Sequence, residues 1–349
     1  MVSARTARFC GALALAGLVL GVTPVDVGAR PKPPVIEAPP EPPMPDVDLA
    51  SRFVREAAAY EDYMREAETI SPAFADAGGV ARALREGASY EPEAFLRGEM
   101  AYAAIAALQD PVFVAAVRDS GPTPEARYAI VRKIYADPAN VMTFAGARSA
   151  AGRAKDALSE DGMRLFDGGK AVKLAAYSIQ HQAWSLTEVA DLQGRLAAVK
   201  ALSSAPRPVS SEETELLEQA VSGERLATMA ANPAPPPYSP LIVRAVALAA
   251  LAAVGQAGDD NAANLTWLLE DYFTAHCLAQ AKLALNECLA VARPNYEDVF
   301  CLGQHAMNDT GSCVVRGAGS VVPLELATEK YSVPPAKGAR RKGTHRKRS

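Results

Sequence analysis

The chain has little of what a β-sheet needs. Aromatic residues make up only 6% of its 349 residues, and the runs of Val, Ile, Thr and Tyr that are typical of strands are nearly absent. Alanine dominates instead, and it is the best helix former because its side chain loses no rotamer entropy. The composition therefore predicts an all-α protein.

Signatures of hydrolases, metalloproteases and nucleotide-binding loops are also missing. The chain has no Gly-x-Ser-x-Gly, no His-Glu-x-x-His and no Gly-x4-Gly-Lys-Ser/Thr. Gly168-Gly169-Lys170 lacks the rest of a phosphate loop, and Glu212-Glu213 lies where a helix start is expected. The sequence therefore favours a structural or binding role over catalysis, and it indicates no cofactor and no metal.

Positive charge is concentrated at the C-terminal end. The net charge is −4, yet Lys337–Ser349 contains seven Lys or Arg and no acid, which leaves the body of the chain acidic. We expect this tail to be disordered and to bind anionic lipid head groups or envelope polymers through its charges, although it could equally be a solubilising tail or dock on its own acidic body. A folded nucleic-acid-binding surface is not indicated. The basic residues concerned are Lys337, Arg340, Arg341, Lys342, Arg346, Lys347 and Arg348.

The N-terminus has the layout of a secretory signal peptide. Arg5 and Arg8 precede a short apolar run, Cys10–Val22, and small residues follow at Val27-Gly28-Ala29. The run is too short to cross a bilayer comfortably, which takes about 20 residues. We therefore expect cleavage and export, the alternative being an uncleaved inner-membrane anchor. The Ala, Arg, Gly and Pro bias resembles that of GC-rich bacterial genomes, so the expected compartment is the periplasm of a bacterial envelope or the medium.

Proline-rich breaks divide the rest of the chain. Together with the signal layout and the basic tail, these breaks predict six segments. The segments are a signal peptide at 1–29, a Pro-rich linker at 30–46, an N-terminal helical bundle at 47–204, a linker helix with a Pro-rich break at 205–240, a C-terminal helical subdomain at 241–332 and a basic tail at 333–349.

The spacing of helix starts predicts a bundle. Asp-Pro, Thr-Pro and Ser-Pro pairs recur after short loops, which is typical of antiparallel neighbours in a bundle of about ten helices. One interruption is expected at Asp167-Gly168-Gly169 in a long helical stretch. An irregular α-solenoid is the alternative architecture, although no fixed repeat period is evident.

The four cysteines outside the signal segment predict a disulfide-closed hairpin. Cys277 and Cys288 are eleven residues apart, so on one helix they face the same way but lie about 16 Å apart, too far for a bond to each other. An antiparallel hairpin turning at Pro294-Asn295 brings Cys288 near Cys301 and Cys277 near Cys313, the latter just past the end of the last helix. We therefore predict the nested disulfides Cys277–Cys313 and Cys288–Cys301, which export permits. The spacing resembles that of twin-cysteine helical hairpins in geometry only.

A metal site is the alternative use of the same residues. Cys301 and His305 are at i and i+4, so one helix face could present both to zinc, with Cys277 and Cys288 opposite. The absence of a Cys-x2-Cys knuckle and the oxidising compartment favour disulfides. No redox-active Cys-x-x-Cys is present.

The segment from Tyr177 to Trp184 is a second candidate site. Tyr177 and His181 share a helix face and Trp184 follows, while Asp191 and Arg195 lie one helix further on. Such a cluster could form a pocket, either the active site of a periplasmic enzyme or the site of a small-ligand binder. The alternative is a buried polar network that joins two helices.

Overall fold

We describe a computed structural model of the chain, in which residues 44–223 and 233–323 are described. The predicted signal peptide, most of the Pro-rich linker and the basic tail lie outside these residues. Helices account for 75% of the described part, which contains no strand, only two isolated bridges. The prediction of an all-α bundle is confirmed.

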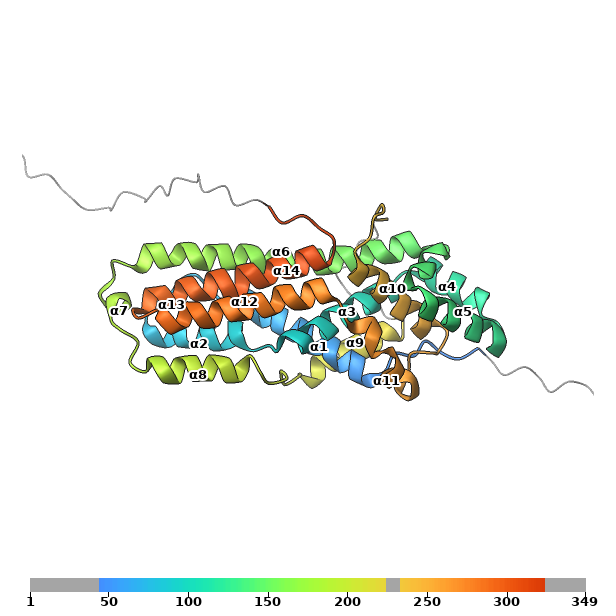
Figure 1. Ribbon diagram of the computed structural model, residues 1–349, viewed down its shortest axis with the longest axis horizontal. Coiled ribbons are helices and arrows are strands. Elements are labelled where there is room, and N and C mark those ends of the chain that lie inside the picture. The colour runs from blue at the N-terminus through green and yellow to red at the C-terminus, as the bar shows by residue number, and fades with distance from the viewer. Residues whose placement is uncertain (1–43, 224–232, 324–349) are drawn as a thin grey trace, which may run out of the picture. The chain divides into compact units, whose positions relative to one another are not determined.

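The helices follow one another after short loops (Figure 1). The α-helices are α1 (Ser51–Glu68), α2 (Ala77–Ala88), α3 (Pro92–Leu108), α4 (Pro111–Ser120), α5 (Pro124–Ala136), α6 (Ala147–Ile179), α7 (Ala183–Leu186), α8 (Leu192–Leu202), α9 (Ser211–Val221), α10 (Pro240–Ala253), α11 (Ala262–Leu265), α12 (Tyr272–Val291), α13 (Asn295–Cys301) and α14 (Thr310–Gly317). Three short 3-10 segments, η1 (Pro138–Thr143), η2 (Asp259–Asn261) and η3 (Thr266–Leu269), and a π-helical segment, η4 (Leu302–Asp309), complete the order.

Side-chain caps begin the helices where the Xaa-Pro pairs predicted them. Asp110 accepts a hydrogen bond from the Phe113 amide at 2.9 Å, and Ser239 accepts one from the Ile242 amide at 3.2 Å. Each cap satisfies an amide that has no partner within the helix, and the proline that follows needs none.

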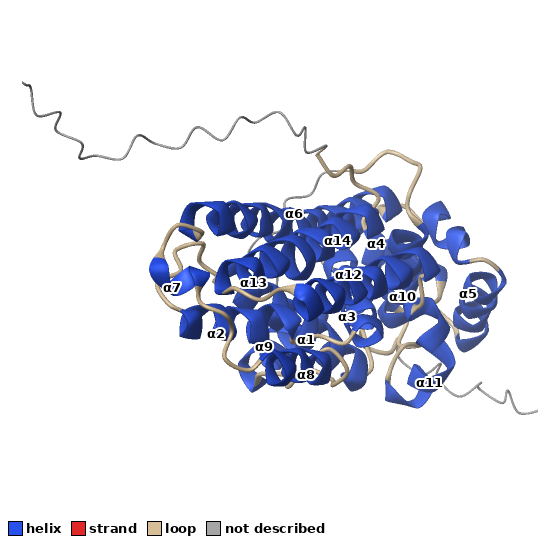
Figure 2. Ribbon diagram, turned by 60° about the vertical axis from the view of Figure 1, so that its left-hand side comes forward, coloured by secondary structure: helices blue, strands red, loops and turns tan. Residues whose placement is uncertain are grey.

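A single hydrophobic core extends over the described residues from Leu49 to Ala318. Its central helix is α10, which is buried on nearly every side and packs on α3. The regions predicted as N-terminal bundle and C-terminal subdomain both contribute to this core. Figures 1 and 2 show α6 lying along α13 and α14, so the last described helices pack against the middle of the chain. Among these helices none is alone long and apolar enough to cross a membrane, although α3 and α4, bent by 87°, pass that test as a pair.

The predicted interruption of α6 at Asp167-Gly168-Gly169 is wrong. The helix runs unbroken from Ala147 to Ile179, and the backbone of η4 packs closely against it at Gly169. A methyl group at Gly169 would lie 2.4 Å from the amide nitrogen of Asn308 and 2.7 Å from the carbonyl oxygen of Gly303. Glycine therefore permits close packing of two helices here and does not end one.

The last helix is also longer than predicted. α13, η4 and α14 form one continuous helical rod from Asn295 to Gly317, so Cys313 lies within it and not beyond its end. The nested pairing is nevertheless confirmed. An outer disulfide joins Cys277 to Cys313 and an inner disulfide joins Cys288 to Cys301, each with Cα atoms 5.7 Å apart.

The π-helical segment explains how unequal spacings form two disulfides. Cys277 and Cys288 are eleven residues apart on α12, whereas Cys301 and Cys313 are twelve apart. On a regular α-helix the twelfth residue would turn Cys313 about 100° further round the axis. A π-helical turn takes one residue more than an α turn, so η4 absorbs the extra residue and returns Cys313 to the side of Cys301.

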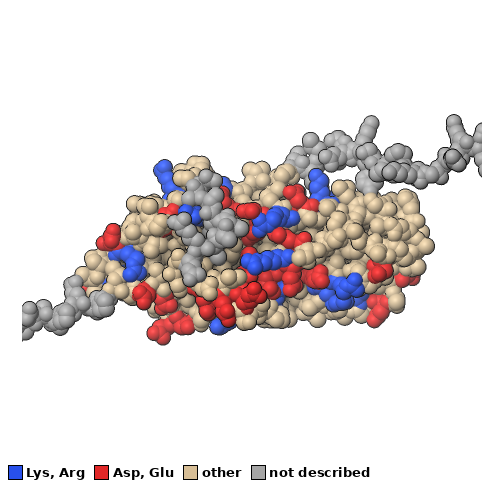
Figure 3. All heavy atoms as spheres, turned by 180° about the vertical axis from the view of Figure 1, so that it is seen from behind, with Lys and Arg blue, Asp and Glu red and all other residues tan. Residues whose placement is uncertain are grey.

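Charges of both signs are intermingled on the surface. On the face seen in Figure 3, acidic side chains gather toward the middle and lower part, with basic ones among them. Ion pairs join neighbouring helices, as Arg97 of α3 shows with Glu56 of α1 at 2.8 Å, both partly exposed. Such half-exposed pairs each contribute little to stability, about 0–1 kcal/mol.

Candidate functional site

The five residues predicted to form one pocket lie in three places. Tyr177 is near the end of α6 and lines a groove beside α13. Asp191 and Arg195 line a different pocket between α2 and α8. His181 is exposed in the turn before α7, and the Trp184 indole donates to the side chain of Gln182 at 2.6 Å. Neither His181 nor Trp184 is among the lining residues described for these two pockets.

The pocket between α2 and α8, which we call the α2–α8 pocket, is apolar over most of its walls. Its volume is about 500 Å³, within the range of small-molecule sites. Helix α2 supplies Ala77, Gly78, Val80, Ala81, Leu84 and Arg85, the segment before α8 supplies Thr187 to Asp191, and α8 and α13 supply Arg195, Ala198, Val199, Asn295 and Asp298.

A buried ion pair lies among these lining residues. The Arg195 guanidinium donates from one terminal nitrogen to Asp298 and from the other to the carbonyl oxygens of Leu289 and Ala292. The side chains of Arg195 and Asp298 are only 9% and 3% exposed. Arg195 Nε is buried and has no hydrogen-bond partner in the described part of the chain.

The environment makes Asp298 an unusual carboxylate. Burial raises its pKa to about 6, although the hydrogen bond and charge of Arg195 favour the ionised form. One carboxylate oxygen accepts from Arg195, and the second accepts from none of the described residues. A buried carboxyl with a perturbed pKa in a pocket is a common feature of functional sites.

The segment from Thr187 to Asp191 is held in place at both ends. The Val189 amide donates to the Arg293 carbonyl at 2.9 Å, and the buried Asn295 side chain donates to the Thr187 carbonyl at 2.9 Å. At the other end the Asp191 side chain accepts from the Gly194 amide and caps α8. The pocket wall is therefore pre-organised by hydrogen bonds.

The α2–α8 pocket combines apolar walls with a few titratable side chains, namely Arg85, Glu188, Asp191, Arg195 and Asp298. Its described lining residues include no Ser, Cys, His or Lys, and the Thr187 hydroxyl already donates to the Trp184 carbonyl at 2.6 Å. Apolar walls with a few buried polar groups are typical of sites that hold a small molecule.

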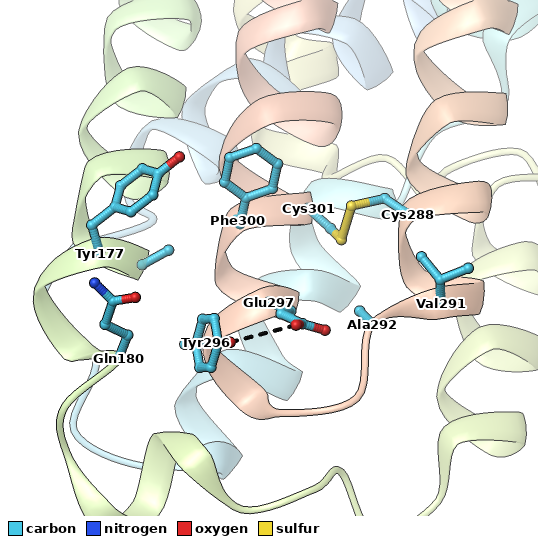
Figure 4. Close-up of a pocket in the computed structure, with 10 residues that line it drawn as sticks. Tyr177, Gln180, Cys288, Val291, Ala292, Tyr296, Glu297, Phe300 and Cys301 are labelled. Carbon is cyan, nitrogen blue, oxygen red and sulfur yellow. Dashed lines mark hydrogen bonds between the residues drawn. A yellow bond between two sulfur atoms is a disulfide. The ribbon is translucent and has the colours of Figure 1, made fainter.

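The groove that contains Tyr177 lies on the opposite face of α13 (Figure 4). Asn295 and Asp298 face the α2–α8 pocket, whereas Tyr296, Glu297 and Phe300 face this groove. None of these five residues of α13 was predicted from the sequence as a site residue. One feature of the sequence could have pointed to them: they directly follow the predicted turn at Pro294-Asn295 and precede Cys301 of the hairpin.

The four cysteines offer no thiolate to a metal because all are in disulfides. His305 instead bonds the carboxylate of Asp309 through Nδ1 at 2.7 Å. Within residues 44–223 and 233–323, no group of three or more His, Cys, Asp or Glu side chains is arranged to hold a metal ion. The zinc alternative is therefore wrong for these cysteines.

Comparison with known proteins gives no relative. No protein-family model, no curated protein and no solved structure matches the chain.

Proposed function

We propose that the protein is an exported binding protein of the bacterial envelope that holds a small, mostly apolar ligand in the α2–α8 pocket. Two disulfides are compatible with an oxidising, extracytoplasmic compartment, which supports the export part of the proposal. Release of the mature protein by osmotic shock, with its signal segment removed, tests that part.

One observation carries the binding part: the buried Arg195–Asp298 pair lines a mostly apolar pocket with part of its hydrogen-bonding capacity unused. Arg195 Nε is a buried donor without a partner in the described chain. One oxygen of Asp298 accepts from Arg195, and the other accepts from none of the described residues. Buried polar groups without partners cost stability. A ligand whose polar head both donates and accepts, such as a primary carboxamide, would complement them while its apolar body lies against Val80, Leu84 and Val199.

Octanamide is a suitable probe, and N,N-dimethyloctanamide, which lacks the donors, is its matched control. We expect octanamide to raise the melting temperature and to bind more tightly by calorimetry, because only it can donate to Asp298. The variant Ala198→Trp places a large side chain at the exposed wall of the pocket and should abolish binding. The variant Ala197→Trp changes the neighbouring exposed residue of α8, which does not line the pocket, and should leave binding intact.

Equal binding of both amides would show that the Arg195–Asp298 pair is only a structural ion pair. Binding by Ala198→Trp as tight as that by Ala197→Trp would show that the ligand does not occupy the α2–α8 pocket.

A further inference from the structure

The groove on the outer face of α13 has aromatic walls (Figure 4). Tyr177 comes from α6, and Tyr296 and Phe300 come from α13. The rings of Tyr177 and Phe300 have centroids 6.3 Å apart and planes at 81°, so they form a corner. Tyr177 is 46% exposed, and a solvent-exposed aromatic ring beside a second ring is a surface able to take a ligand.

The only formal charge among the described lining residues is negative. Glu297 is that charge, and neither Lys nor Arg lines the groove. One Glu297 oxygen accepts from the Arg293 amide at 2.9 Å and the other from the Tyr296 hydroxyl at 3.5 Å. These two bonds hold the carboxylate in place without neutralising it, because both donors are uncharged.

The wall at the end of α12 is apolar, whereas Gln180 of the α6 end adds an amide to the groove. The inner disulfide lies beside Phe300, and Val291 and Ala292 complete the wall at the end of α12. Val291 is 77% exposed. The groove has a volume of about 350 Å³, which suits a small head group. The inner disulfide joins α12 to α13 and so holds this wall beside the helix that carries Tyr296 and Phe300.

We infer that this groove, the aromatic groove, binds an organic cation with an alkylated ammonium head. The faces of aromatic rings carry negative electrostatic potential, which attracts cations, and aromatic cages recognise quaternary ammonium groups in this way. The methyl groups of such a cation complement Val291 and the disulfide, and its charge complements Glu297. A metal ion would instead require several oxygen or sulfur ligands, which the groove does not offer. The inference is independent of the proposed function, because the two sites occupy opposite faces of α13.

Choline and its uncharged isostere 3,3-dimethylbutan-1-ol separate the cation from its shape. We expect choline to bind the full mature chain saturably in a calorimetric or NMR titration and the isostere to bind roughly tenfold more weakly or worse, since it lacks the charge. Equal binding of the two, or no choline binding at millimolar concentration, would overturn the inference.

Three variants test the walls. Tyr177→Leu and Phe300→Leu remove aromatic faces, and Glu297→Gln removes the charge; each should weaken choline binding about threefold to tenfold. Tyr128→Leu is the matched control, because Tyr128 is an exposed tyrosine on α5 outside the groove. Melting temperatures confirm that each variant folds, and the exposed Tyr177 makes its variant the most informative. Wild-type affinity in Tyr177→Leu and Glu297→Gln would overturn the assignment.

The same head group could come from a free solute or from a lipid. If the protein co-sediments with phosphatidylcholine vesicles and Tyr177→Leu abolishes this co-sedimentation, the head group can come from the lipid. If the protein binds choline but does not co-sediment with the vesicles, the ligand is the free solute. If the protein binds no free choline and Tyr177→Leu leaves its binding to vesicles unchanged, the inference is overturned. Ala198→Trp should leave choline binding unchanged, so failure at one site is distinguishable from failure at the other.

Discussion

Replacing Gly169 by alanine should destabilise the protein, although alanine favours a helix more than glycine does. Gly169 lies in α6 where η4 crosses it. The added methyl group would lie 2.4 Å from the Asn308 amide nitrogen and 2.7 Å from the Gly303 carbonyl oxygen. Carbon needs about 3.5–4.0 Å from its neighbours, and backbone atoms cannot rotate away, so the two helices must move apart by on the order of 1 Å.

The size of the effect follows from three contributions. Overpacking of this kind costs about 1–3 kcal/mol. Separation of the helices would also lengthen the 3.1 Å hydrogen bond from Asn308 Nδ2 to the Phe166 carbonyl, at a cost of about 1 kcal/mol. Alanine returns about 1 kcal/mol of helix propensity. The expected net loss of unfolding free energy is therefore about 1–3 kcal/mol.

The preceding residue is the matched control. A methyl group at Gly168 would meet only the flexible end of Met307, at 3.3 Å. Gly168→Ala should therefore be neutral or stabilise the helix by up to about 1 kcal/mol. Urea unfolding followed by far-UV circular dichroism compares the two variants at equal disulfide content. If Gly169→Ala unfolds at the same urea concentration as Gly168→Ala, the close approach of α6 and η4 does not contribute to stability and the reasoning is refuted.

Four further predictions concern buried charges, the disulfides and the tail. Both oxygens of Glu99 are buried without a hydrogen-bond partner in the described chain, and burial, with the charges of Asp271 and Asp161, raises the pKa of Glu99 well above 4.5. The folded state therefore binds a proton that the unfolded state releases, so the unfolding free energy falls as pH rises above about 4.5. Glu99→Gln should reduce that slope in urea unfolding. Burial lowers the pKa of Lys282 well below 10.5, so the unfolded state binds more protons and the unfolding free energy rises as pH approaches 10.5. Lys282→Met should reduce this rise in unfolding free energy, and an unchanged pH dependence would contradict the prediction. The outer disulfide closes a separation of 36 residues and the inner one a separation of 13. Loop-closure entropy therefore predicts that replacing the cysteines by alanine lowers the unfolding free energy by ~4 kcal/mol for the outer disulfide and ~3 kcal/mol for the inner one. A larger loss for the inner disulfide in urea unfolding would refute the entropic account. Deletion of Lys337–Ser349 should release the protein from envelope fractions at low salt if the tail binds an anionic surface, and unchanged partitioning would argue against it.

Local physics makes part of this protein readable from the sequence. Helix class, the Xaa-Pro starts and the caps at Asp110 and Ser239 depend on residues within one turn, so composition and spacing predict them. The disulfide pairing was also predictable, because helix periodicity fixes which way two cysteines face and the turn at Pro294 brings the partners together.

The tertiary structure decided what depends on contacts between distant segments. Gly169 reads as a helix break until η4 is known to pack against it, and the π-helical turns that align Cys313 have no signature in the spacing alone. The α2–α8 pocket joins Arg195 to Asp298 across 103 residues, and the aromatic groove joins Tyr177 to Phe300. The five residues predicted as one cluster are therefore divided between these two pockets and the turn that holds His181 and Trp184, which lines neither. Periodicity assigns each of these residues to a face of its own helix, whereas packing between helices determines which faces meet.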